Sequence, residues 1–391
     1  MALAANSIIS QNRTLNSLSF PLPKLRSTHH HPQKLNLQFQ DNHHQCCFTT
    51  AAPPISCVAK TSFSDVEVQS LNPTTTSSTN SWSEFAKNVS GEWDGFGADF
   101  TSEGNPIELP EFVVPEAYRE WEVKVFDWQT QCPTLAQPEE SVMFYKSIKL
   151  LPTVGCEADA ATQYKIDERN IGGVDDKVSA FAYQSSGCYV AVWPIEDDGT
   201  YKLLELEHCL INPHDRESRV RIIQVVGVQD KMMVLKNIRV FREQWYGPFR
   251  NGDQLGGCAI RDSGFAATDA LKASEVVGSW QAPCAVACFA GSQNTSLREL
   301  VGDSVQKLTR DESDLILLPK QLWCSLKASE DGETFCEAGW LFDQGNAITS
   351  RCIFSNDAKL KASNLYSTRN CIFGGRIASH HITVRISSSH S

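Results

Sequence analysis

Gly91-Glu92-Trp93 and Gly278-Ser279-Trp280 are two copies of one short signal, a glycine two residues before a tryptophan. Each copy follows a segment with the apolar spacing of a short helix. These segments start at Ser81 and Thr268, at the same interval before the glycine. Long stretches typical of β-strands follow both copies. A repeat at a long interval predicts that one structural unit occurs twice in the chain. Two unrelated core tryptophans are the alternative explanation.

The stretches after each tryptophan alternate apolar and polar residues with a period of two. Leu204 and Leu206, for example, alternate with Glu205 and Glu207. Turn signals such as Asn212-Pro213 separate the runs, and this pattern predicts antiparallel strands with one buried face. We expect strands at 142–150, 189–193, 204–207, 219–222 and 237–240, and in the second half at 315–318, 322–326, 335–342, 347–354 and 359–366.

Strands at such regular spacing indicate a closed or nearly closed barrel, because closure removes exposed strand edges. A Gly-x-Trp signal after a helical turn is typical of the start of a lipocalin-like barrel. The tryptophan plugs one end of such a barrel, and the glycine lets the backbone pass close to it. We therefore predict an all-β fold of two tandem lipocalin-like antiparallel β-barrels, each preceded by a short helix. The barrel-plug residues are Gly91, Trp93, Gly278 and Trp280.

Changes of composition along the chain predict where the units begin and end. We assign 1–57 to a chloroplast transit peptide, 58–80 to a disordered linker, 81–250 to the first barrel, 251–267 to an inter-barrel linker, 268–370 to the second barrel and 371–391 to a disordered tail. The glycine-rich stretch at 251–267 can also be a long loop within one domain. Beyond Asn370 the core pattern stops, so the second barrel can lack its closing strand.

The first 60 residues hold five Lys and Arg residues and one acid, Asp41, among many Ser, Thr, Asn and Gln residues. These are features of a transit peptide, and Ile55-Ser56-Cys57-Val58 resembles a stromal processing site. The net charge of the chain is −11, and an acidic body argues against nucleic-acid binding. No apolar run approaches the roughly 20 residues that span a membrane. We expect a protein of the chloroplast stroma with no membrane span.

The predicted body offers few residues for catalysis or metal binding. Its histidines are His208, expected at the end of a strand, and His214, expected in a turn. Glu205 and Glu207 share one strand face, and such a pair can flank a glycosidic bond, although an exposed acidic stripe is commoner. We predict no catalytic residue, no metal and no cofactor. The chain has 14 cysteines without paired spacing, which leaves a regulatory disulfide open.

A local excess of positive charge lies between residues 216 and 250. Arg219 and Arg221 share strand parity and should project together from an otherwise acidic protein. Arg, Trp and Tyr dominate the hot spots of protein interfaces, and a basic patch favours docking to an acidic protein surface. A solvated barrel exterior is the alternative. The candidate interface comprises Arg216, Arg219, Arg221, Arg239, Arg242, Trp245 and Tyr246.

Three segments, at 82–95, 145–148 and 241–247, resemble a plant and cyanobacterial family of lipocalin-like proteins. The likeness covers roughly residues 80–370, and the chain departs from the family pattern after Asn370. The resemblance implies a chaperone-like stromal assembly factor without catalytic residues. It implies that the partners are the β and γ subunits of the chloroplast ATP synthase catalytic head. We expect the factor to be a monomer.

A second class of function stays open, because lipocalin-like barrels can hold one small ligand. The alternative is a carrier or attachment factor for a small apolar or tetrapyrrole ligand. Large side chains expected to face inward, at Phe144, Trp193 and Phe241, favour a filled barrel and therefore a binding scaffold. A hydrolase that depends on His208 is a third alternative.

Overall fold

The computed structural model describes residues 77–154, 163–174, 176–195, 202–253, 264–289, 296–343 and 345–367. The predicted transit peptide and the predicted tail lie outside the described residues, as do most of the two predicted linkers. Strands predominate in the described part, so the all-β prediction is confirmed. Across these ranges, no helix has the length and apolar character needed to cross a membrane.

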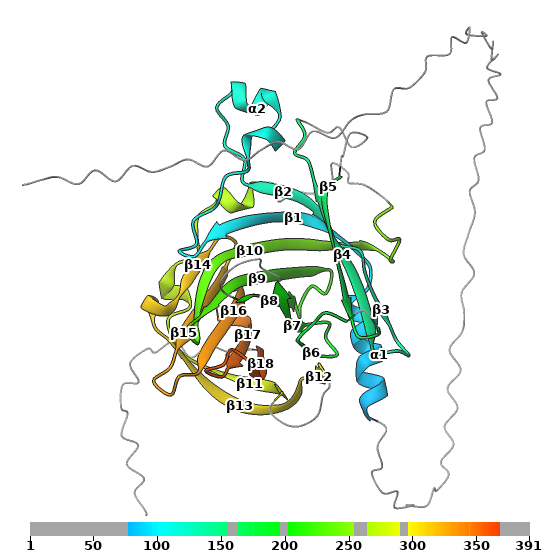
Figure 1. Ribbon diagram of the computed structural model, residues 1–391, viewed down its shortest axis with the longest axis vertical. Helices are drawn as coiled ribbons and strands as arrows, with labels where there is room; N and C mark the ends of the chain where they lie inside the picture. The colour runs from blue at the N-terminus through cyan, green and yellow to red at the C-terminus, as the bar shows by residue number, and fades with distance from the viewer. Residues whose placement is uncertain are drawn as a thin grey trace, which may run out of the picture. The chain divides into compact units, whose positions relative to one another are not determined.

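The first sheet holds eleven strands, and Figure 1 shows it curling from β12 and β6 round to β4. Their order is β12-β6-β7-β8-β9-β10-β1-β2-β4-β3, and β5 pairs with β4. The strands are β1 (Glu92–Thr101), β2 (Asp127–Gln131), β3 (Thr134–Gln137), β4 (Val142–Leu150), β5 (Gln163–Ile171), β6 (Ala180–Tyr183), β7 (Tyr189–Ile195), β8 (Lys202–Ile211), β9 (Ser218–Gln229), β10 (Met232–Gly247) and β12 (Leu297–Glu299).

The second sheet holds seven antiparallel strands in the order β13-β11-β18-β17-β16-β15-β14. The strands expected after both tryptophans are confirmed, with ends that differ by up to seven residues. The strands are β11 (Gly278–Cys288), β13 (Val301–Arg310), β14 (Ile316–Leu318), β15 (Leu322–Ala328), β16 (Thr334–Asp343), β17 (Asn346–Phe354) and β18 (Leu360–Ser367), with the turn η5 (Glu312–Asp314) before β14.

Neither sheet closes on itself by hydrogen bonds within the described residues. In addition, β12 comes from the second half of the chain but pairs in parallel with β6 of the first sheet. Buried residues of both sheets form one continuous apolar cluster, which includes Leu206 and Ile222 of the first sheet and Ala338 and Cys352 of the second. The two repeats are therefore two sheets, of which the first is curled, and they share a core.

Helix α1 (Ser77–Val89) makes hydrogen bonds to β3, at one edge of the first sheet, and to the turn between β6 and β7, next to the other edge. The Trp82 indole Nε1 donates to the Gln137 carbonyl of β3 at 2.7 Å. The Asn88 side chain donates to the Ser185 carbonyl, just after β6, also at 2.7 Å. The helix thus covers the gap that closing hydrogen bonds would fill. The helix begins at Ser77, whereas the sequence predicts a start at Ser81.

The predicted apolar face of this helix is confirmed, since Trp82, Phe85 and Val89 are all buried. The helix expected before Gly278 is not formed within 264–277. Two short 3-10 turns, η3 (Phe265–Ala267) and η4 (Ala273–Glu275), take its place.

Strand β8 is buried on both faces. Its even-numbered residues face the second sheet, where the His208 Nδ1 lies 3.0 Å from the Ser350 hydroxyl. Its odd-numbered residues face the interior of the first sheet, so Glu205 and Glu207 are buried. The exposed acidic stripe was therefore a wrong prediction, as was the placement of His208 at a strand end. Alternation indicates two faces, but a second covering layer removes the exposed one.

Candidate functional site

The inner face of the first sheet surrounds a polar cavity of about 170 Å³, which we call the first chamber. Side chains from β1, β4, β5, β8, β9 and β10 converge there because alternate residues of each strand point to the same face. The lining residues are Asp99, Tyr145, Ser147, Lys149, Lys165, Asp167, Arg169, Glu207, Arg221, Ile223, Arg239 and Phe241.

A buried ion-pair network adjoins the first chamber and contributes Arg221 and Glu207 to its wall. Arg219 Nε lies 2.6 Å from a carboxylate oxygen of Glu243, and Arg221 Nη2 lies 2.8 Å from the other. Arg221 Nη1 also contacts Glu207 at 3.0 Å. All four side chains are almost fully buried. A buried charge is tolerated only where a partner and further hydrogen bonds compensate it, and each of these charges has both.

Aromatic side chains supply further hydrogen bonds to the buried Glu207 carboxylate. Tyr189 donates its hydroxyl to Glu207 Oε1 at 2.9 Å, and the Trp193 indole donates to Oε2 at 3.2 Å. The Tyr145 hydroxyl donates to the same carboxylate. Four donors, counting Arg221, thus surround one carboxylate. Such a saturated carboxylate is a structural anchor, because its lone pairs are already used.

The pKa values of these groups keep the network charged. Burial would raise the pKa of Glu207, but the guanidinium groups of Arg221 and Arg169 outweigh burial and lower it. Burial also acts to raise the pKa of Glu243, but the guanidinium groups of Arg219 and Arg221 outweigh it and lower the pKa. Both carboxyl groups are therefore ionised at neutral pH.

The first Gly-x-Trp signal is tied to this network. The Trp93 indole donates to the Val89 carbonyl at the end of α1 at 2.9 Å. The guanidinium carbon of Arg219 lies over its ring, 4.2 Å from the centroid. The indole thus links the helix end to the buried charges, through a hydrogen bond on one side and a cation–π contact on the other.

The second sheet repeats this arrangement around a cavity of about 140 Å³, the second chamber. The Trp280 indole donates to the Val276 carbonyl at 2.9 Å, and the Arg310 guanidinium lies 5.2 Å from its ring centroid. Arg310 Nε contacts Glu337 at 2.5 Å, and Arg351 contacts the same carboxylate at 2.7 Å. Both copies of the sequence signal therefore mark a buried tryptophan–arginine–glutamate set.

The two glycines differ in what they are needed for. Both have positive φ, +142° at Gly91 and +116° at Gly278, which favours glycine. A Cβ on Gly91 would lie 2.1 Å from the Trp245 indole nitrogen, whereas a Cβ on Gly278 would meet nothing within 4 Å. Gly91 is therefore required by its backbone conformation and by the close approach of Trp245, which is not the tryptophan of the signal, and Gly278 is required by its backbone conformation alone.

These contacts show that the prediction of a basic docking face around Arg219 and Arg221 is wrong. Arg219 and Arg221 do project together, but they point inward and each is only 1% exposed. The reason is that Glu243 and Glu207 lie on neighbouring strands and neutralise them inside the sheet. These two arginines cannot meet a partner protein.

The other residues of the predicted interface differ in how far they are buried. Arg239 is half-buried and pairs with Glu205 at 2.6 Å. Arg242 and Trp245 are half-buried as well, and the Trp245 indole donates to the Ser90 carbonyl. Arg216 and Tyr246 are exposed. The arginine-centred interface is therefore not a continuous surface.

A different surface exposes large apolar side chains. The segment between β1 and β2 folds into η1 (Glu111–Val113) and α2 (Glu116–Glu120) over a small core of its own. Phe112 on this segment is 79% exposed, and its ring lies 6.5 Å from that of Tyr164 on β5. Trp121, which caps α2, is 61% exposed. We call Phe112, Trp121, Tyr164 and Ile166 the aromatic cap; α2 and the start of β5 lie at the same end of the first sheet in Figure 1.

The segment that carries Phe112 and Trp121 is acidic. The segment from 102 to 126 carries two bases, Arg119 and Lys124, against six acids, which are Glu103, Glu108, Glu111, Glu116, Glu120 and Glu122. Large exposed aromatic groups with a polar rim are typical of protein-interaction sites. The apolar pattern of the sequence does not indicate this surface, because the segment has no strand or helix periodicity. Its run of aromatic residues and acids between Pro110 and Phe126 is the signal that could have indicated it.

Comparison with known proteins shows a distant structural likeness. No family model and no curated protein matches the chain. Six chains of solved structures match it in structure. One of them is a protein of unknown function of the DUF3598 family, from Nostoc punctiforme PCC 73102. It aligns with a TM-score of 0.44 and 11% sequence identity, over 74% of this chain and 98% of that chain.

Proposed function

We propose that this protein is a non-enzymatic, chaperone-like assembly factor of the chloroplast stroma. It binds the β and γ subunits of the ATP synthase catalytic head while the head is incomplete. The two sheets are, in this proposal, two lipocalin-like units of one scaffold. The resemblance at residues 82–95, 145–148 and 241–247 supports the choice of partner. The aromatic cap is the observation that carries the proposal of a docking function.

The aromatic cap supports docking because it offers what a partner interface needs. Phe112 and Trp121 expose most of their side chains on an ordered segment, with the Tyr118 hydroxyl anchored to the Thr153 carbonyl at 3.0 Å. Rigid aromatic groups lose little conformational entropy on binding and bury a large area. Unassembled subunits expose apolar surface that otherwise leads to aggregation.

The charge around the aromatic cap defines the kind of partner surface that fits it. Six acids and two bases within 102–126 favour a partner segment that is both apolar and positively charged. This reverses the polarity expected from the sequence, where Arg219 and Arg221 were to meet an acidic surface. We therefore propose that the bound subunit segment is a basic, amphipathic one.

The two chambers support a scaffold over a barrel-interior carrier. Their volumes are about 170 and 140 Å³, below the roughly 300–1,000 Å³ of ordinary ligand pockets. Their walls include arginines and glutamates that bind one another, as at Arg221–Glu207 and Arg310–Glu337. A tetrapyrrole or other bulky apolar ligand would have to break these pairs. A visible absorption band in protein purified from leaf would favour the carrier instead.

Affinity capture from stroma tests the proposal. We expect the wild-type protein to retain the β and γ subunits, and a Phe112→Ser, Trp121→Ser double variant to lose most of both. The matched control is Met232→Ser with Val234→Ser, which changes two exposed apolar residues of the β9–β10 hairpin. It should retain the subunits at the wild-type level.

The two parts of the proposal fail in different ways. If the wild-type eluate contains no ATP synthase subunit, the proposed partner is wrong. If the Phe112→Ser, Trp121→Ser variant captures as much as the control variant, the aromatic cap is not the docking surface.

A further inference from the structure

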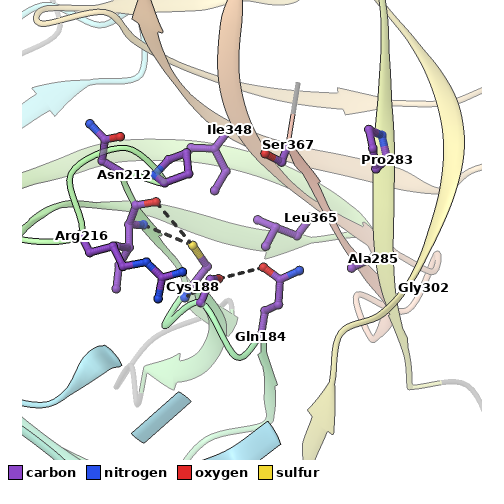
Figure 2. A pocket seen from close by; sticks show the side chains of 13 residues that line it. Gln184, Cys188, Asn212, Arg216, Pro283, Ala285, Gly302, Ile348, Leu365 and Ser367 are labelled. Carbon is purple, nitrogen blue, oxygen red and sulfur yellow. Dashed lines mark hydrogen bonds between the residues drawn. The ribbon is translucent and has the colours of Figure 1, made fainter. Parts of the chain in front are cut away.

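A third cavity lies between the two sheets and shares no residue with the aromatic cap or with either chamber. Its volume is about 270 Å³. The loops after β6 and β8 line one side, and strands β11, β17 and β18 line the other. Figure 2 shows Arg216, Asn212 and Cys188 on the first side, with Leu365 and Ala285 across from them. We call this the inter-sheet cavity.

The walls of the inter-sheet cavity are mostly apolar, with Ile211, Pro213, Ala285, Ile348 and Leu365 contributing carbon surface. Its volume exceeds the 150 Å³ or so of an apolar cavity that holds benzene. It falls just below the lower bound of about 300 Å³ for drug-sized ligands. The space therefore fits one or two rings, or a short alkyl chain.

The charge of the lining residues favours a negatively charged ligand. Arg216 is the one charged residue among the residues described as lining this cavity, and it is exposed. Its Nη1 donates to the neutral Asn88 side-chain oxygen at 3.2 Å. Gln184, Asn212 and Ser367 add neutral polar groups. A guanidinium group binds carboxylates through strong, paired hydrogen bonds, so the cavity suits an anion with an apolar body.

We propose that the inter-sheet cavity binds a small apolar carboxylate. The chain or ring of the ligand lies between the two sheets, against Ala285 and Leu365, and its carboxylate accepts hydrogen bonds from Arg216. This site differs from the interior of a lipocalin-like barrel, because it is formed by two sheets packing together. The proposal stands independently of the docking function.

Binding at this place has a measurable consequence for stability. The ligand contacts the first sheet through Ile211 and the second through Leu365, so it requires both sheets to be folded. A ligand that binds only the folded state raises the unfolding temperature, and the rise grows with the logarithm of the ligand concentration above the dissociation constant. The same contacts thus predict both binding and thermal stabilisation.

Octanoate and 1-octanol, titrated into the whole protein by calorimetry, test the two halves of the site. We expect the wild type to bind octanoate more tightly than octanol and to melt at a higher temperature with octanoate. Arg216→Gln should weaken octanoate binding about tenfold or more, because it removes a charge-assisted pair. The same variant should leave octanol binding unchanged.

Two occluding variants locate the site. Ser367→Trp and Pro283→Trp place an indole at exposed rim positions of the inter-sheet cavity, and each should abolish binding of both probes while the circular dichroism spectrum stays wild-type. Phe112→Ser, on the aromatic cap, should leave both unchanged. The proposal is overturned if the wild type shows no saturable octanoate binding. It is also overturned if both tryptophan variants bind normally, or if Phe112→Ser alone removes binding.

Discussion

The guanidinium of Arg219 lies over the indole of Trp93, with its central carbon 4.2 Å from the ring centroid. This contact joins the first Gly-x-Trp signal to the buried ion-pair network beside the first chamber, because Arg219 also pairs with Glu243. Arg310 and Trp280 repeat the relationship in the second sheet. Each sheet is thus organised round one buried tryptophan–arginine–glutamate set, and this makes the arginines structural groups.

Replacing Arg219 should therefore destabilise the protein strongly. Arg219→Met leaves the Glu243 carboxylate with one arginine instead of two, and removing one partner of a buried pair costs roughly 3–5 kcal/mol. We expect about 3 kcal/mol, because Arg221 stays in place. Urea unfolding measures the loss. Arg216→Met, at an exposed position, is the control and should change the free energy of unfolding by less than about 0.5 kcal/mol; equal losses would contradict the burial argument.

The two signal glycines should respond differently to the same substitution. Gly91→Ala combines a strained positive φ with a clash against the Trp245 indole, whereas Gly278→Ala meets only the strained backbone. Strain of this kind costs about 1–3 kcal/mol, and overpacking adds about 1–3 kcal/mol. Thermal unfolding of both variants should show the larger loss at Gly91. A larger loss at Gly278 would contradict the assigned contacts.

His208 should make stability fall in mild acid. Burial lowers its pKa to about 4 in the folded protein, from an ordinary value of 6.5, although Gln224, Glu337 and Glu207 oppose this. As pH falls below about 6.5 the unfolded chain takes up a proton that the folded one refuses until about pH 4, so stability is lost in this window. The loss reaches about 3 kcal/mol.

His208→Gln, which keeps a hydrogen-bonding group toward Ser350, isolates this effect. The difference in unfolding free energy between wild type and variant should shrink or reverse as pH falls from 7 to 4. A difference that stays constant over that range would show that His208 does not titrate there.

Asp94 should act with the opposite sign. Burial, followed by the neighbouring Glu92 carboxylate, raises its pKa to about 7 from an ordinary value of 3.8. The folded state therefore holds a proton that the unfolded state releases above about pH 4, and stability is lost as pH rises toward 7. Asp94→Asn should stabilise the protein by about 1–3 kcal/mol at pH 8 and by nothing at pH 4. Destabilisation at pH 8 would mean that the carboxylate itself is required.

Much of the fold could be predicted from local pattern. The repeated Gly-x-Trp signal marks the two sheets, and period-two alternation locates most long strands. The parity of Arg219 and Arg221 correctly indicates that they project together. The alternation of residues along a strand does not show which part of the protein covers each face of that strand. Charged residues are mostly exposed, so the sequence predicts Arg219 and Glu207 in contact with solvent. In the structure both are buried, because partners distant in sequence, such as Glu243 for Arg219, neutralise their charges.

Other features depend on contacts that no local pattern records. Strand β12 is only three residues long, and it pairs with β6 across more than a hundred residues of chain. The aromatic cap lies on an aperiodic segment, and Phe112 meets Tyr164 only once β5 is in place. The inter-sheet cavity exists because two sheets pack together, so neither repeat alone indicates it.

Site-specific photo-crosslinking at position 112 tests the docking proposal most directly. A benzophenone amino acid replaces Phe112 in one sample and the exposed Met232 in another, and each protein is irradiated in stromal extract. The docking proposal predicts that residue 112 forms adducts with ATP synthase β or γ subunits, at a basic, amphipathic segment, and that residue 232 forms none. Adducts at 232 but not at 112, or the absence of these subunits from every adduct, would contradict it.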